Sequence, residues 1–244
     1  MLPVSLCLDF GNTNWKGALF QGDRMAEKFM FSQNAILDDL TRVVTIYNPE
    51  KIILASVVNH DRSIEELLAK HATLFVLNSY DFRLPFLNAY GSPETLGHDR
   101  LALVAALSKF YPGEDSLVIS VGSCVTYNFL AKNNAFRGGA ISPGLEMRLR
   151  SMSDFTQKLP LISREGHVSL LGYDTETSLR SGAVMGIASE IDGMIERYEG
   201  QYGKINAVLT GGDGPFFESR LKSKIFADSN FLFKGLYAIL EIQK

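Results

Sequence analysis

The two halves of this chain carry one and the same local pattern, in which an apolar strand, a glycine turn and a second apolar strand follow one another. Residues 6–20 read LCLDFGNTNWKGALF, and residues 117–130 read LVISVGSCVTYNFL. The alignment pairs four positions: Asp9 with Ser120, Gly11 with Gly122, Asn12 with Ser123 and Thr13 with Cys124. Such units are common and two can match by chance. The alternative is a duplicated fold whose two glycine turns face each other across a cleft.

The segments between the repeats alternate between strand and helix patterns, which predicts an α/β fold. A duplication then implies two lobes, residues 1–112 and 113–244, which meet near Tyr111-Pro112-Gly113. Continuous apolar runs or turn-bounded segments predict strands at 6–10, 17–21, 26–31, 51–58, 74–77 and 205–209. Helical spacing and start signals predict helices at 36–47, 63–71, 92–110, 143–155, 175–198 and 232–242.

Composition excludes several classes of protein. Of the 244 residues 46% are hydrophobic and 21% charged, and the net charge of −3 gives no global attraction to nucleic acid or to anionic membranes. No window approaches the 18 apolar residues of a membrane span, and the N-terminal segment lacks the features of a signal peptide, so a cytoplasmic location is expected. Cys7 and Cys124 lie in apolar runs, which favours buried, reduced thiols, and the four histidines show no metal-ligand spacing.

The first glycine turn carries residues that suit a phosphate group. Gly11 leaves room for backbone N–H groups to approach anionic oxygens, and Asn12 and Thr13 add side-chain donors. Lys16 adds a mobile positive charge. A carboxylate beside such donors repels phosphate, so Asp9 fits this site only when a cation such as Mg²⁺ bridges the two.

A β-turn chosen only for the turn propensity of asparagine and threonine remains the alternative. The chain has neither a G-x-x-x-x-G-K-[ST] loop nor a G-x-G-x-x-G turn that opens a helix, so P-loop and Rossmann interpretations are poor. The second turn and a third glycine site, Thr210-Gly211-Gly212-Asp213, favour nucleotide binding.

A second group of functional residues is Gly97-His98-Asp99-Arg100, at the start of a predicted helix. An acid and a base at a helix start often only complement the helix dipole or form a surface ion pair. The functional interpretation is that Asp99 accepts a proton from a substrate hydroxyl while Arg100 pairs with an anionic group. Phosphoryl transfer needs aligned oxygens, neutralised charge and a carboxylate near the nucleophile.

Taken together, these motifs resemble the type III pantothenate kinases. Asp9 to Thr13 resembles their first phosphate motif, and Tyr90 with Gly97 to Arg100 resembles their pantothenate motif. Residues 138–144, GGAISPG, resemble the G-G-x-I-x-P-G signature of the family. Further positions follow in the family's order: Leu159-Pro160, Thr175, Ser181-Gly182, Thr210 to Asp213 and Gly235-Leu236.

The resemblance implies a duplicated actin-like ATPase fold of the ribonuclease H-like type, with a nucleotide cleft between its lobes. It implies transfer of the ATP γ-phosphoryl group to pantothenate, the first step of coenzyme A synthesis, with Asp99 as general base. The implied ligands of ATP and Mg²⁺ are Asp9, Phe10, Gly11, Asn12, Thr13, Asn14, Trp15, Lys16 and Ser123. The implied pantothenate site comprises Tyr90, Gly97, His98, Asp99 and Arg100. Thr175 would complete that site from the partner subunit of a homodimer.

Two other functions remain open. A non-catalytic ATP-binding regulator on the same fold, similar to accessory factors of transcription, would explain a changed second phosphate motif. The retention of Asp9, Lys16, Asp99 and Arg100 speaks against lost catalysis. A kinase for another small hydroxylated acid is the third interpretation, because Tyr90 and Arg100 would fix a carboxylate but not the length of the ligand.

The second phosphate motif departs from the family pattern D-x-G-T, because this chain has Ser120-Val121-Gly122-Ser123. In the family that aspartate helps to bind a monovalent cation, K⁺ or NH₄⁺, whereas Ser120 offers only a neutral hydroxyl. Asn128 also replaces a commonly acidic residue. We therefore expect turnover to depend on K⁺ less than in relatives, or differently, as measured in K⁺ and in Na⁺ salt. Strong, selective activation by K⁺ would show that another group replaces the missing carboxylate.

Overall fold

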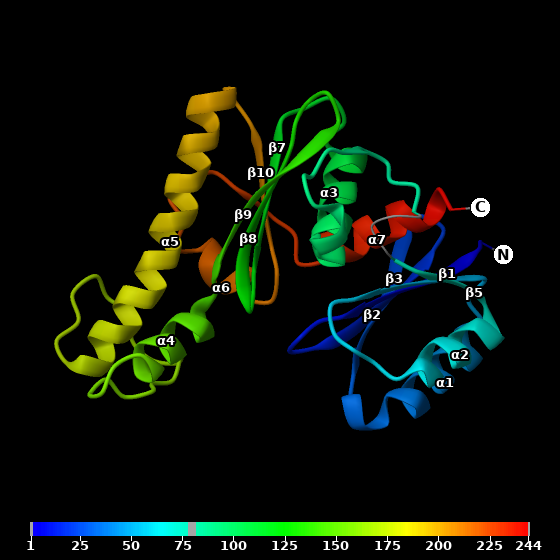
Figure 1. Ribbon diagram of the computed structural model, residues 1–244, viewed down its shortest axis with the longest axis horizontal. Helices are drawn as coiled ribbons and strands as arrows, with labels where there is room; N and C mark the ends of the chain where they lie inside the picture. The colour runs from blue at the N-terminus through cyan, green and yellow to red at the C-terminus, as the bar shows by residue number, and fades with distance from the viewer. Residues whose placement is uncertain (1, 78–81, 244) are drawn as a thin grey trace. The chain divides into compact units, whose positions relative to one another are not determined.

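The computed structural model describes residues 2–77 and 82–243 (Figure 1). Their contacts group the chain into two compact units. Unit 1 contains Met1–Pro112, Asn134–Arg137 and Asn230–Lys244, and unit 2 contains Gly113–Asn133 and Gly138–Ser229. The division into two lobes, residues 1–112 and 113–244, stays a prediction. The two units are defined by which residues contact one another, and each unit contains separate segments of the chain.

Unit 1 is built on a five-stranded sheet with the order β3-β2-β1-β4-β5. Its strands are β1 (Val4–Phe10), β2 (Trp15–Gln21), β3 (Arg24–Phe31), β4 (Lys51–Ser56) and β5 (Thr73–Val76). β1 runs antiparallel to β2 and parallel to β4, and β4 runs parallel to β5. The apolar run that predicted a strand to residue 58 ends its pairing at Ser56, where the chain turns toward the next helix.

Helices cover both faces of this sheet. Alternate residues of β1, Leu6, Leu8 and Phe10, pack in one core with α1 (Ile36–Tyr47) and α2 (Arg62–His71). The opposite face contacts α7 (Phe231–Glu241), where Tyr237 stacks on Phe20 of β2, and α7 packs along α3 (His98–Phe110). The short 3-10 helix Gln33–Ala35 leads into α1.

The predicted helix 92–110 is two elements. Pro93–Thr95 forms a 3-10 turn, and α3 begins only at His98. Leu96 between them is extended and buried, so its side chain enters the core and interrupts the helix. Gly97 then forms the N-cap, and the helix start lies at the Gly97-His98-Asp99-Arg100 motif, as the sequence indicated.

Unit 2 has a sheet in which the strands follow the order β11-β10-β7-β8-β9. They are β7 (Ser116–Val121), β8 (Cys124–Leu130), β9 (Ala135–Pro143), β10 (Asn206–Thr210) and β11 (Phe226–Ala227). Alternate residues of β7 and β8 pack in one core with α4 (Leu145–Asp154), α5 (Thr175–Tyr202) and α6 (Gly214–Glu218). The first three residues of β9 belong to unit 1, and two of them, Ala135 and Phe136, pair in parallel with β6 (Leu87–Asn88).

The two sheets repeat one arrangement. β7 runs antiparallel to β8 and parallel to β10, as β1 does to β2 and β4, and each sheet ends in one more parallel strand. Asp9 and Ser120 are both the last residue but one of the central strand. The two sheets match in strand order, in strand direction and in the position of Asp9 and Ser120, so a chance match of the two sequence segments is untenable. The predicted α/β fold with two related sheets is confirmed.

Within the described part of the chain, no helix combines the length and apolar character that a membrane crossing requires.

The close packing of α7 on α3 depends on Gly235. A Cβ at this position would overlap the backbone carbonyl oxygen of Ala102. Gly235→Ala is therefore expected to lower the free energy of unfolding by about 1–3 kcal/mol, the usual cost of overpacking. Gly193→Ala in α5 is the control, since a Cβ there meets no atom within 4 Å. Thermal unfolding measures both, and equal midpoints for the two variants would contradict the tight crossing.

Candidate active site

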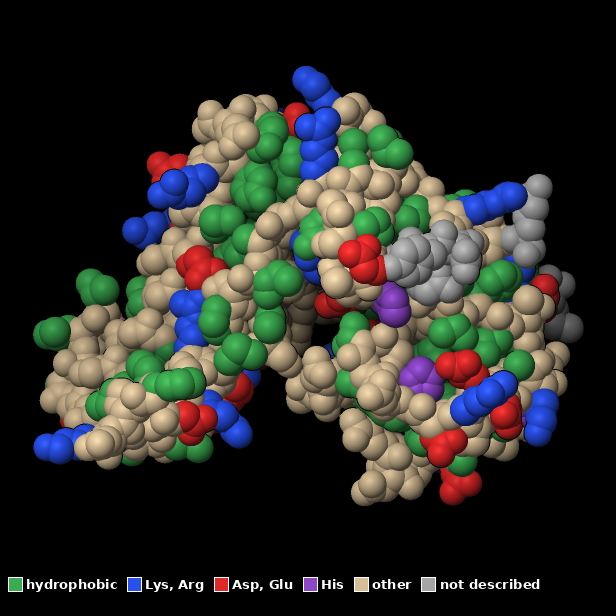
Figure 2. All heavy atoms as spheres, viewed as in Figure 1, with side chains coloured by type: hydrophobic (Ala, Val, Ile, Leu, Met, Phe, Trp, Pro, Cys, Tyr) green, Lys and Arg blue, Asp and Glu red, His purple; other side chains and the backbone are tan. Residues whose placement is uncertain are grey.

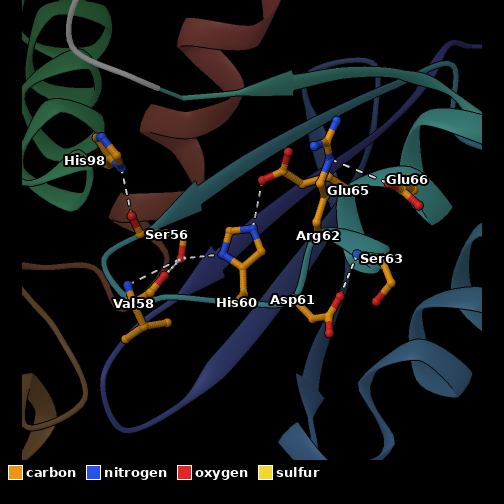
Figure 3. Close-up of polar contacts among 9 residues, drawn as sticks. All are labelled: Ser56, Val58, His60, Asp61, Arg62, Ser63, Glu65, Glu66 and His98. Atoms are coloured by element: carbon orange, nitrogen blue, oxygen red, sulfur yellow. Dashed lines mark hydrogen bonds and ion pairs between the residues drawn. The ribbon is translucent and has the colours of Figure 1, made fainter.

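The candidate site in unit 1 forms where the carboxyl ends of β1 and β4 meet the start of α3. Phe10 and Ser56 are register partners, and the Val57 N–H donates to the Phe10 carbonyl at 3.1 Å. The His98 Nδ1 lies 2.9 Å from the Ser56 carbonyl oxygen, to which it donates (Figure 3). Ligands of open α/β sheets bind beyond the carboxyl ends of the strands.

Asp9 carries the largest electrostatic change at this edge. Burial and, to a lesser extent, the negative charge of Asp99 raise the pKa of Asp9 to about 7, although the positive charge of Lys16 acts to lower it. Lys16 lies opposite Asp9 in the antiparallel register of β1 and β2, so both side chains leave the same face of the sheet. At neutral pH this edge of the sheet therefore holds a carboxyl group that is close to its midpoint of ionisation.

Asp99 lies in the first turn of α3, over its N-cap. Burial raises the pKa of Asp99, while its hydrogen bond to the Arg100 N–H and the charge of Arg100 lower it. A Cβ on Gly97 would lie 2.5 Å from Asp99 Oδ1, so the glycine leaves the space that this carboxyl group occupies. A carboxylate whose pKa is raised toward neutrality is a better proton acceptor.

Arg100 is enclosed by aromatic rings. Its guanidinium carbon lies 5.3 Å from the centroid of the Tyr90 ring and 5.8 Å from that of Phe136, and these two rings stack at 5.9 Å. Nη1 lies 3.5 Å from the Tyr90 hydroxyl. Arg100 is only 5% exposed, which makes it a rigid, positively charged wall that suits an anionic ligand.

The first glycine turn divides its residues between the core and the surface. The Phe10 and Trp15 rings stack at 4.3 Å inside unit 1, so only their backbone groups could reach a nucleotide. The Gly11 N–H donates to the Asn14 carbonyl across the turn. Asn12, Thr13 and Asn14 are exposed, and their groups are the ones best placed to meet a phosphate.

In unit 2 three glycine-containing segments meet at the second turn. Gly211 has φ 94°, and a Cβ there would overlap the Val121 carbonyl, which also accepts from the Asp213 N–H at 2.9 Å. Gly144 lies against the carbonyl groups of Gly122 and Ser123, and its N–H donates to Ser123 at 3.1 Å. The sequence motifs around residues 122, 144 and 211 therefore form one local structure.

Ser120 lies between neutral hydroxyl residues. Its register partners are Thr126 on β8 and Thr210 on β10, and Asn128 donates to the Thr126 hydroxyl at 3.3 Å. None of these four side chains is charged, which fits the expectation that the K⁺ dependence differs from the family pattern.

Thr175 is the first residue of α5 and is exposed. Asp174 caps this helix and forms a capping box with Thr177. A pocket of about 510 Å³ lies beside Thr175, and its wall includes Met152, Leu159 and Leu179.

The predicted site residues thus fall into two sets, one in each unit. Unit 1 brings together Asp9, the turn that follows it, Tyr90 and residues 97–100, while Ser120, Ser123 and Thr175 belong to unit 2. The roles of all these residues stay predictions. Sequence reasoning missed Ser56, His60 and Phe136, because their place beside the site comes from strand register for Ser56 and from tertiary side-chain contacts for His60 and Phe136, and not from a local motif.

Mg²⁺ fits the chemistry of the first set. Among the described residues no group of three or more His, Cys, Asp or Glu side chains could hold a metal ion. Mg²⁺ commonly binds through one or two carboxylates together with water and substrate phosphates. The negative charge of Asp99 raises the pKa of Asp9, and a bound cation relieves repulsion of this kind.

Comparison with known proteins decides the family. A profile of type III pantothenate kinases matches residues 5–197. The chain belongs to the type III pantothenate kinase family. It is 40% identical over 242 residues to the type III pantothenate kinase of Christiangramia forsetii, with 99% of each chain covered. It is 41% identical over 237 residues to that of Bacteroides fragilis, with 97% of each covered.

Solved structures of proteins with low sequence identity share the fold of this type III pantothenate kinase. A conserved Baf family protein of Campylobacter jejuni, named as a candidate transcriptional activator, superposes with a TM-score of 0.60 at 21% identity, with 97% of each chain covered. A ROK family glucokinase from Streptomyces griseus, in complex with glucose and AMPPNP, gives 0.52 at 11% identity with 98% of each covered. These likenesses place the chain among the sugar-kinase and actin-like folds.

The raised pKa of Asp9 has a consequence for stability. Because the pKa of about 7 in the folded state exceeds the ordinary value of 3.8, the folded protein binds more protons between these values, and stability falls as pH rises through this window. Asp9→Asn removes this penalty and is expected to stabilise the unliganded protein at pH 8 by on the order of 2–4 kcal/mol.

Thermal unfolding of Asp9→Asn and wild type at a series of pH values tests this. The gain should disappear toward pH ~4, where both states hold the proton. Asp23→Asn, at a side chain that is 82% exposed, is the control and should show no such trend. A variant no more stable than wild type at pH 8 would contradict the buried, repelled state of Asp9.

Proposed function

We propose that this protein phosphorylates the hydroxyl group of pantothenate with ATP, in the first step of coenzyme A synthesis, and that Asp99 is the general base. Family membership over the whole chain supports the reaction. The observation that carries the role of Asp99 is its place at the N-terminus of α3, half-buried and close enough to Asp9 to raise the pKa of that group.

In the proposed reaction Asp99 accepts the proton of the pantothenate hydroxyl as its oxygen bonds to the γ-phosphorus, and the bond to the β–γ bridging oxygen breaks to release ADP. The turn after Asp9 binds the phosphates through Asn12, Thr13 and Lys16, and Ser123 is a further ATP ligand that the family motif implies. Asp9 would hold Mg²⁺ through water, and the ion would supply positive charge against the phosphates. Tight alignment of these groups supplies most of the catalysis in such reactions.

We assign the pantothenate carboxylate to Arg100. A charge-assisted hydrogen bond from a fixed guanidinium to a carboxylate is strong and directional. The guanidinium of Arg100 is fixed by its contacts with the aromatic rings of Tyr90 and Phe136. Tyr90, Gly97 and His98 complete the wall of the substrate site in this proposal.

Asp99→Asn tests the central assignment. The amide keeps the size of the side chain but cannot accept the proton, so kcat should fall by about 10²–10⁴, the usual contribution of a general base. Steady-state turnover of pantothenate with Mg-ATP measures it, and ATP binding by calorimetry shows whether the nucleotide site is intact. Undiminished turnover would remove Asp99 from this role. Absent turnover in the wild type with intact ATP binding would favour a regulator.

We further propose a homodimer in which Thr175 reaches the pantothenate site of the partner subunit. The surface around the start of α5 in unit 2 exposes several large apolar side chains, namely Phe155, Leu161, Leu170, Leu171 and Tyr173, with exposures of 59–88% (Figure 2). Exposed apolar patches of this kind commonly mark protein interfaces.

Complementation between two damaged subunits tests this arrangement. Thr175→Ala is expected to raise the KM for pantothenate about tenfold, the effect of one lost hydrogen bond of about 1.4 kcal/mol. Mixed dimers of Thr175→Ala and Asp99→Asn subunits should contain one site with both native residues, so activity at pantothenate concentrations well below the KM of Thr175→Ala should exceed that of either variant alone. No recovery at any mixing ratio would show that Thr175 acts within its own chain.

A further inference from the structure

A polar network links β4 to α2 beside the candidate site. The His60 ring has Nδ1 3.1 Å from the Ser56 Oγ and Nε2 3.0 Å from the Glu65 Oε1 (Figure 3). The Ser56 hydroxyl lies 2.8 Å from the Val58 carbonyl. The His60 side chain is 10% exposed, and Glu65 lies in the first turn of α2. These contacts lie within residues 56–65, which we call the β4–α2 corner.

The number of protons available in the β4–α2 corner identifies the donor in each of these hydrogen bonds. A carbonyl only accepts, so the single proton of the Ser56 hydroxyl goes to Val58, and the Ser56 Oγ then accepts from His60 Nδ1–H. The Glu65 carboxylate also only accepts, so it requires a proton on His60 Nε2. All three contacts are satisfied together when His60 carries both protons and forms an ion pair with Glu65.

The trio of serine, histidine and carboxylate is not a hydrolytic triad. In such a triad the serine hydroxyl donates to the histidine, which takes its proton. The Ser56 proton is committed to the Val58 carbonyl, and His60 donates to the serine in place of accepting from it. The corner therefore holds Ser56 in place and does not activate it.

Ser56, held in this way, forms a hydrogen bond with His98 at the start of α3. Its carbonyl accepts from His98 Nδ1 at 2.9 Å, and His98 precedes Asp99. His60 also meets the ring of Phe10 edge-on, with centroids 5.7 Å apart, and Phe10 lies between Asp9 and Gly11. One imidazole thus touches the end of β1 directly and the start of α3 through Ser56.

We propose that His60, paired with Glu65, is a positioning residue for phosphoryl transfer: it holds Ser56 so that the carbonyl of Ser56 fixes the ring of His98 and the start of α3, on which Asp99 lies. The kinetic part of this inference rests on the proposed function. Glu65 itself lies on α2 and its side chain is 38% exposed, so its effect on catalysis passes through His60.

The same contact sets the tautomer of His98. Because the Ser56 carbonyl accepts only, Nδ1 of His98 carries a proton, and in the neutral ring the lone pair lies on Nε2. His98 therefore offers an acceptor at Nε2, which suits a hydroxyl or amide N–H donor of the substrate.

Neighbouring glutamates on α2 provide a matched pair of variants. Glu65→Ala breaks the pair with His60, whereas Glu66→Ala removes only an exposed pair with Arg62 at 3.6 Å (Figure 3). We expect Glu65→Ala to lower kcat/KM for pantothenate about tenfold, below the roughly 10²-fold cost of displacing a reacting group by 1 Å. Glu66→Ala should match the wild type. Equal kinetics for the two variants would overturn the proposal.

Conservative replacement separates positioning from bulk stability. In Glu65→Gln the amide oxygen can still accept from His60, so this variant should recover most of the lost kcat/KM, while thermal unfolding of all three variants is recorded. Glu65→Gln as impaired as Glu65→Ala, despite an unchanged unfolding midpoint, would overturn a geometric role. His60→Ala should show at least the loss of Glu65→Ala, since it removes the centre of the network.

A spectroscopic readout is independent of catalysis. ¹⁵N NMR of histidine-labelled protein, with the His98 signals assigned through His98→Gln, should show a protonated Nδ1 and, in the neutral ring, an unprotonated Nε2. In His60→Ala these signals should broaden or move toward a mixture of tautomers. A neutral His98 with its proton on Nε2 in the wild type would overturn the proposal even if pantothenate turnover is normal. If His98 has the expected tautomer but the protein does not phosphorylate pantothenate, only the proposed function is rejected.

Discussion

The parallel pairing of β1 with β4 is the constraint on which the candidate site depends. It brings the end of β1, with Asp9 and the glycine turn, beside Ser56 at the end of β4. The Ser56 carbonyl then accepts from His98, so the start of α3 lies at the same edge. Residues far apart in the sequence meet because two strands end together, and no local motif could achieve this alone.

The price of this arrangement is electrostatic. Asp9 and Asp99 are both removed from water, and burial raises the pKa of each. Lys16 and Arg100 offset part of the penalty, while the hydrogen bond from the start of α3 favours the ionised form of Asp99. Functional sites often hold such unfavourable groups, since a ligand that supplies the missing positive charge gains binding energy from their relief.

The sequence predicted the elements that have strong local signals. The strand predicted at residues 51–58 was confirmed over residues 51–56, and the helix 36–47 was confirmed. The long helix from Thr175 was also confirmed, although it extends to Tyr202 and not only to residue 198. The helix predicted from residue 92 was wrong at its start, because burial of Leu96 overrides the local start signal. The two-residue strands β6 and β11 carry no detectable pattern and depend on their partner strands.

For the site, the glycine motifs were visible in the sequence, and some of their glycines are required for a physical reason, such as the positive φ of Gly211 and the close approach of Gly144 to the Gly122 carbonyl. The side chains that support them were not visible. His60 and Phe136 have ordinary sequence surroundings and gain their place only through contacts with Ser56 and Arg100. A residue that acts by holding another leaves no local signature, and tertiary contacts are needed to find it.

The return of the last helix to unit 1 has a consequence for biogenesis. α7 belongs to unit 1 and packs along α3 and against β1 and β4, although all of unit 2 is translated before it. The sheet of unit 1 therefore emerges from the ribosome with one apolar face uncovered, and it stays so until α7 is made. A nascent chain of this protein should engage chaperones until α7 is made, and premature termination just before α7 should leave the sheet of unit 1 with this face uncovered.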